Sequence, residues 1–170
     1  MDELQRLADA YRVRASSVKS KLDVLMDLER IRDPRVVPFM LNVLADPNES
    51  GQVRIYVVKQ LRNSGGLLVP ADRPGVAQAM GNVLAGSSSE ELRIQAALAL
   101  ADFTQIDDAL SGLGAVALAE DESIDLRYAA FTSIERAGPT PEGVALVQQI
   151  ARDETLGAAA RSVLSAWHVD

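Results

Sequence analysis

Few side chains in this sequence could carry out acid–base or nucleophilic chemistry. There is no cysteine and one histidine, His168, which excludes a thiolate nucleophile, a thiolate zinc site and any site that needs two imidazoles. His168 lies two residues from the last residue, where chain ends fray, and no neighbour is evident that would hold it as a general base. We interpret it as a helix-end residue that interacts favourably with the helix dipole.

Two groups of carboxylates are close enough in the sequence to share a proton or a cation. They are Asp107–Asp108 and Glu120–Asp121–Glu122 with Asp125. Neither group has the spacing of a calcium-binding loop with its central glycine. Acidic residues are common near helix N-termini because they interact favourably with the helix dipole there. We therefore predict no catalytic residue, no metal site and no cofactor.

Glycine pairs raise the possibility of a phosphate-binding loop, but the residues around them do not support one. Neither Gly65–Gly66 nor Gly112-x-Gly114 is accompanied by a Lys-Ser/Thr pair or a GxGxxG pattern. Gly65–Gly66 is typical of a helix end. Gly112 and Gly114 lie within a predicted helix, where the missing side chains would allow a second helix to pack closely.

Basic residues recur along the chain at a nearly constant interval. Each follows a small or apolar residue and opens a stretch with apolar residues at helical spacing; these bases are Lys19, Arg54, Arg93, Arg127 and Arg161. The steps between them are 35, 39, 34 and 34 residues. An apolar residue followed by Ala recurs ahead of the last four, at Leu44, Leu84, Leu118 and Ile150. Two marks with nearly the same period indicate an internal repeat.

Each repeat is predicted to be a pair of helices, because apolar residues recur at intervals of three and four. Capping residues before proline (Asp33-Pro34 and Thr140-Pro141) and a capping box from Ser88 to Glu91 mark helix starts. The predicted pairs are 2–14 with 16–31, 34–45 with 50–63, 73–86 with 88–102, 106–119 with 123–136, and 141–152 with 154–168. The sequence thus predicts an all-α, right-handed α-solenoid of about five antiparallel helical hairpins, forming one domain over residues 1–170.

These residues resemble the HEAT repeat of the armadillo-like helical proteins. The resemblance lies in an apolar–Arg pair that opens the second helix, followed by small or apolar residues three, six and seven positions later. The matching residues are Arg93, Ala96, Ala99 and Leu100, and Arg127, Ala130, Ser133 and Ile134. The resemblance implies that an Asp six residues before the Arg, as in Asp121 and Arg127, pairs with an Arg across repeats. It does not extend to HEAT-like metal hydroxylases, because their paired His-Glu motifs are missing.

The resemblance also implies that the second helices line a concave wall, with the first, second and fifth residues after each Arg facing it. From these positions and their counterparts in the first pair we take six partner-binding candidates: Lys21, Tyr56, Lys59, Gln95, Tyr128 and Thr132. Residues 63–74 form an insertion, in which Leu67 and Leu68 either cap the core or contact a partner.

Charge is unevenly distributed along the chain. Residues 1–62 hold 11 basic and 9 acidic residues, a net charge of +2, and residues 63–170 hold 6 and 15, a net charge of −9, which together give −7. Such a gradient could orient an extended partner, drive head-to-tail association, or have no meaning for a partner. The oligomeric state stays open.

We predict a non-catalytic scaffold or adaptor that binds another protein along the concave wall. The polar, acidic N-terminus and the lack of a long apolar run favour a cytoplasmic protein without a membrane segment. The net charge disfavours nucleic acid as the partner. The HEAT resemblance implies two alternatives, a bilin lyase or chaperone-type protein and, more remotely, a DNA-binding glycosylase.

Overall fold

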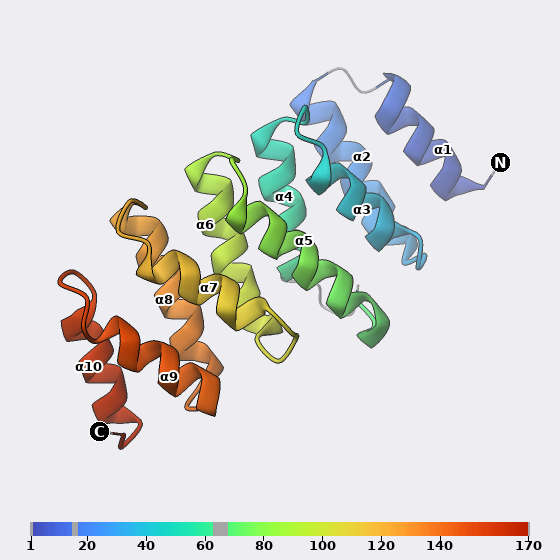
Figure 1. Ribbon diagram of the computed structural model, residues 1–170. Helices are drawn as coiled ribbons and strands as arrows, with labels where there is room; N and C mark the ends of the chain where they lie inside the picture. The colour runs from blue at the N-terminus through green and yellow to red at the C-terminus, as the bar shows by residue number, and fades with distance from the viewer. Residues whose placement is uncertain (1, 15–16, 63–67, 170) are drawn as a thin grey trace. The chain divides into compact units, whose positions relative to one another are not determined.

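The computed structural model describes residues 2–14, 17–62 and 68–169, and the regular structure within these ranges is entirely helical (Figure 1). The helices follow one another as adjacent pairs, which confirms the predicted all-α fold of helical hairpins. Contacts between residues group the chain into two compact units, Met1–Ala79 and Met80–Asp170, which we call unit 1 and unit 2. None of the helices in the described ranges is long and apolar enough to cross a membrane.

Unit 1 is built from two hairpins. Its helices are α1 (Glu3–Asp9), which continues into a π-helical turn (Ala10–Arg14), α2 (Val18–Ile31), α3 (Val36–Ala45) and α4 (Gly51–Arg62). α1 packs on α2, α3 packs on α4, and α2 also contacts α4. The fully buried apolar side chains of α2, α3 and α4 include Leu25, Leu28, Met40, Leu44 and Leu61.

Unit 2 repeats the same pattern. A 3₁₀ turn (Pro70–Asp72) leads into α5 (Arg73–Ala85), which crosses from unit 1 into unit 2. The remaining helices are α6 (Glu90–Ala99), which continues into a 3₁₀ turn (Leu100–Phe103), α7 (Ala109–Leu118), α8 (Ile124–Ala137), α9 (Pro141–Ile150) and α10 (Gly157–Ala166). α7 packs on α8 and α9 packs on α10, while α6 lies beside α8 and α7 lies beside α9 (Figure 1).

The predicted helix start agrees with the structure at α9 and differs from it by one residue at α6. Thr140 caps α9 as predicted, because its Oγ1 accepts from the amide of Gly143 at 3.0 Å. The predicted box from Ser88 is wrong by one residue: α6 begins at Glu90, so Ser89 is the cap, and its Oγ accepts from Leu92.

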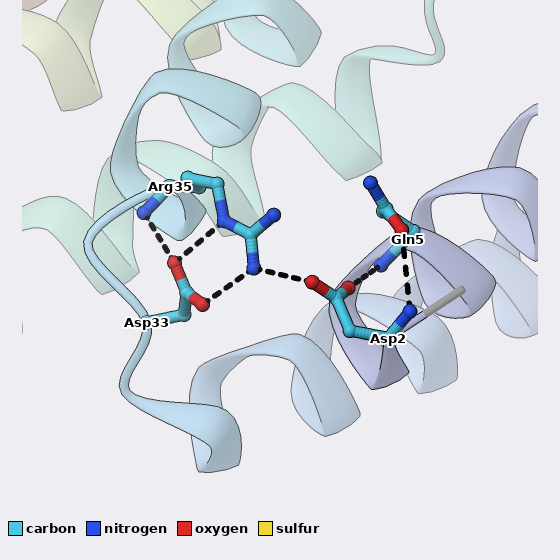
Figure 2. Close-up of polar contacts among 4 residues, drawn as sticks. All are labelled: Asp2, Gln5, Asp33 and Arg35. Atoms are coloured by element: carbon cyan, nitrogen blue, oxygen red, sulfur yellow. Dashed lines mark hydrogen bonds and ion pairs between the residues drawn. The ribbon is translucent and has the colours of Figure 1, made fainter.

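Asp33 does not cap α3, which begins at Val36 with Arg35 as its N-cap. Asp33 instead joins an ion-pair cluster between the starts of α1 and α3 (Figure 2). Arg35 Nη2 lies 2.8 Å from a carboxylate oxygen of Asp33 and 2.8 Å from one of Asp2, the residue that forms a capping box with Gln5. The Arg35 guanidinium lowers the pKa of Asp33 to about 2.

Close packing was predicted at both glycines of α7, and the structure confirms it at one. A Cβ atom on Gly114 would lie 2.5 Å from Cδ2 of Leu146 on α9, closer than real atoms approach. Gly114 therefore lets α9 lie against α7. At Gly112 the prediction is wrong, because an added Cβ would meet nothing within 4 Å among the described atoms.

Candidate partner-binding surface

The recurring arginines join the two helices of each of the last four hairpins. Each donates a hydrogen bond from its guanidinium to a carbonyl at the C-terminal end of the first helix, where carbonyls lack partners within the helix. The pairs are Arg54 with Leu44 at 2.8 Å, Arg93 with Leu84 at 2.9 Å, Arg127 with Ala117 at 3.0 Å, and Arg161 with Ala151 at 2.9 Å. The contact fixes the rotation of each second helix about its own axis.

Carboxylates from the following hairpin complete this ladder, but the predicted Asp121 is not one of them. Arg93 makes two hydrogen bonds, of 2.9 and 2.8 Å, with Glu122, which immediately precedes the N-cap of α8. Asp121 lies one residue earlier in the turn and is exposed. Arg127 lies 2.6 Å from Asp153, and both side chains are less than 10% exposed. The hairpins and this ladder make the fold HEAT-like.

The base of the first repeat is Lys21, two residues later than the sequence pattern indicates. Lys21 Nζ lies 2.8 Å from Glu49, which also accepts a hydrogen bond from the buried Tyr11 hydroxyl. Lys19, on α2, is exposed. These contacts lower the pKa of the Glu49 carboxyl, although its burial alone would raise it.

Arg93 and Arg127 make equivalent contacts, so equivalent residues after them lie on the same side of α6 and α8. The first and fifth residues after each Arg are Ile94 and Leu98 on α6 and Tyr128 and Thr132 on α8. Ile124, one turn before Tyr128, extends this set because residues four apart share a helix face. The two helices pack side by side, so the five residues form one surface, which we call the α6–α8 face.

Tyr128 is the most exposed residue of the α6–α8 face. Its exposed fraction is 47%, that of Ile124 is 45%, and the other three residues of the face are half-buried. The Tyr128 ring packs edge-to-face on the buried Phe131, with centroids 6.1 Å apart. Its backbone carbonyl accepts a hydrogen bond from Thr132 Oγ1 at 2.9 Å. The sequence identified Tyr128 and Thr132 as candidates, whereas it missed Ile124, which the four-residue spacing to Tyr128 could have revealed.

Gln95 lies on α6 but away from this face. It is the second residue after its Arg, and in unit 1 the equivalent Tyr56 points toward the preceding second helix, α2. By the same register Gln95 lies on the side of α6 opposite α8. It is half-buried.

In unit 1 the polar ends of two candidates are already bonded. Lys21 pairs with Glu49, and the Tyr56 hydroxyl donates a hydrogen bond to Glu29 Oε1 at 2.9 Å. Burial raises the pKa of Glu29, although the hydrogen bond from Tyr56 acts in the opposite direction. Lys59 is exposed on α4. Of these three candidates, Lys59 alone is exposed.

The insertion remains open as a contact site. Leu67 lies outside the described residues, and Leu68 is half-buried. Val69, which follows, is 51% exposed, and its amide donates to Asp72 at 3.1 Å. Both predicted roles of these leucines, as a cap on the core and as a partner contact, stay predictions.

Within the described ranges, no group of three or more His, Asp or Glu side chains is placed to hold a metal ion. His168 follows the end of α10 and is exposed, with a left-handed backbone φ of 60°.

Comparison with known proteins gives a distant structural similarity. No known protein family matches the sequence, and no curated protein matches it. The solved structure of human deoxyhypusine hydroxylase in complex with glycerol is similar, with 14% sequence identity and a TM-score of 0.46, over 97% of this chain and 84% of that chain.

Proposed function

We propose that this chain is a non-catalytic protein-binding module that holds a partner protein on the α6–α8 face. The observation that carries the proposal is the exposure of Ile124 and Tyr128, one turn apart on α8. Large apolar side chains that lie together on a surface mark binding sites more often than isolated ones do. Tyrosine is a frequent anchor in protein interfaces, because its ring buries a large area and its hydroxyl can still donate a hydrogen bond.

The surroundings of Tyr128 support binding without reorganisation. The Tyr128 ring rests on Phe131. Arg127, which immediately precedes Tyr128, forms hydrogen bonds with α7 and with the turn before α10. The buried Ser133 hydroxyl donates to the carbonyl of Ala97 at 2.6 Å and so ties α8 to α6. A surface held in its binding geometry loses little conformational entropy when a partner docks.

Affinity capture from native cell extract with site-specific variants tests the proposal. We expect Ile124→Ala combined with Tyr128→Ala to reduce recovery of the partner, because truncating an anchor costs about 2 kcal/mol, roughly a 30-fold loss of affinity. Recovery is measured by quantitative mass spectrometry of the captured proteins. Circular dichroism confirms that helicity is unchanged.

The matched control is Met26→Ala, which truncates an apolar side chain of similar exposure, 42%, on α2 of unit 1. We expect the wild type and the control to retain proteins that the double variant loses. Equal recovery by all three chains would contradict the assignment of the α6–α8 face.

A further inference from the structure

Carboxylates flank the apolar residues of the α6–α8 face in a repeated register. Glu91 on α6 and Asp125 on α8 each lie two residues before the ladder arginine of their helix. They also lie three residues before Ile94 and Tyr128, respectively, and residues three apart are neighbours on a helix surface. Both carboxylates are exposed. Ile94 and Tyr128 therefore each have a carboxylate beside them at the same position of their helix.

Both carboxylates lie outside the ion pairs formed by the described residues of unit 2. No ion pair involves Glu91 or Asp125 within the residues that the structure describes. Residues 80–170 hold 14 acidic residues and five arginines, a net charge of −9. Four of the five are engaged: Arg93 and Arg127 pair with carboxylates, Arg136 pairs with Asp102, and Arg161 donates to the carbonyl of Ala151. The field around the face is thus negative.

We propose that the segment of the partner that docks on the α6–α8 face is basic, with an apolar side chain between two Lys or Arg residues. The inference rests on the proposed function and names the chemistry of its partner. The cations would meet Glu91 and Asp125, and the apolar side chain would pack against Tyr128. Axes of packed helices lie about 8–10 Å apart, and an extended chain advances about 3.3 Å per residue. The two cations are therefore expected roughly three residues apart.

The same charges disfavour other occupants of the face. Phosphates of a nucleic acid and an acidic protein segment would be repelled by Glu91 and Asp125. A second copy of this chain would have to offer residues 1–79, whose 12 basic and 10 acidic residues give a net charge of only +2. Complementarity is greater for a dedicated basic segment.

Binding of short labelled peptides, followed by fluorescence anisotropy, tests the proposal on the full chain. The probe carries two arginines roughly three residues apart with a leucine between them, and a second peptide has glutamates in place of the arginines. The test variant is Glu91→Lys combined with Asp125→Lys. The control is Glu142→Lys combined with Glu154→Lys, which changes the net charge equally at exposed residues on α9 and in the turn after it.

We expect the arginine peptide to bind the wild type and the control with similar affinity. The test variant should bind it at least about tenfold more weakly, because two attractive contacts become repulsive. The test variant should in turn gain affinity for the glutamate peptide. Equal weakening by the control, or no binding of the arginine peptide to the wild type, would overturn the proposal.

The test variant also separates this inference from the proposed function. One outcome of the capture experiment is that Glu91→Lys combined with Asp125→Lys retains the same proteins that the Tyr128 variant loses. That result would support the proposed binding function and show that the docking segment of the partner is not basic. Sedimentation velocity without peptide measures self-association. If the wild type self-associates and the same variant does not, the face binds a second copy of this chain, which would overturn the proposal of a basic partner segment.

Discussion

Arg127 shows how a single residue can hold three helices in register. Only 5% of its surface is exposed, and such burial of a charge is costly unless its donors are bonded. The carbonyl of Ala117 at the end of α7 accepts from Nε, and Asp153 before α10 accepts from Nη2. Asp153 also accepts from the amides of Thr155 and Leu156, each at 2.8 Å, and its contacts lower the pKa of its carboxyl.

We expect Asp153→Ala to lower the free energy of unfolding by about 3 kcal/mol, because it leaves the Arg127 guanidinium buried with one partner fewer. Chemical denaturation with urea measures the change. The control is Asp121→Ala, at the residue that the sequence pattern favours, which is exposed and should change stability by less than about 0.5 kcal/mol. Equal losses in the two variants would show that the ladder does not depend on Asp153.

Whole helices were more predictable than the contacts of individual side chains. Apolar periodicity depends on which side of a helix is buried, so it located each helix pair to within a few residues. Contacts across repeats depend on the path of short turns, which the sequence does not encode as a period. For this reason Glu122 rather than Asp121 meets Arg93, and Lys21 rather than Lys19 meets Glu49.

On the candidate surface too, the position of a residue on its helix was predictable from the sequence, whereas its contacts with other helices were not. Tyr128 and Thr132 follow from counting residues after Arg127, because the contact of that arginine sets the rotation of α8. Tyr56 was also predicted by counting, but whether its hydroxyl is bonded depends on Glu29 of another helix. Exposure of a predicted position is therefore a property of the packed pair of hairpins and not of one helix.

The two glycines of α7 should respond oppositely to alanine. Gly112→Ala is expected to stabilise the chain by about 0.5–1 kcal/mol, because alanine loses less backbone entropy in a helix and its Cβ meets nothing. Gly114→Ala has the same favourable backbone-entropy effect, but it forces Leu146 to move, which costs about 1–3 kcal/mol. We therefore expect Gly114→Ala to lower the free energy of unfolding. Thermal and urea unfolding measure both effects.

Leu146→Ala provides the matched background for this comparison. With the leucine shortened, the obstacle to a Cβ on Gly114 is removed, and Gly114→Ala should become stabilising relative to Leu146→Ala alone. If Gly114→Ala stabilises the wild-type chain as much as Gly112→Ala does, Leu146 does not hinder a Cβ atom at residue 114, and the inferred close packing of α7 and α9 is wrong.

At the scale of the molecule, net charge and the ladder act over different distances. The ladder pairs lie in direct contact and are partly shielded from solvent, so salt screens them weakly. The excess of carboxylates over residues 80–170 acts through solvent and is screened strongly. Self-repulsion of this excess should therefore dominate the salt dependence of stability.

Two exposed carboxylates allow that repulsion to be measured. Glu120 follows the end of α7 and Glu135 lies in the last turn of α8, where the negative end of the helix dipole adds to the repulsion. We expect Glu120→Gln combined with Glu135→Gln to raise Tm by about 2–4 °C at low salt, equivalent to about 1 kcal/mol. Arg152→Gln, which removes an exposed cation, should lower Tm. Both shifts should vanish in about 1 M salt, where the Debye length falls to about 3 Å. A shift that persists there would reflect local contacts of these side chains instead of the charge of the whole unit.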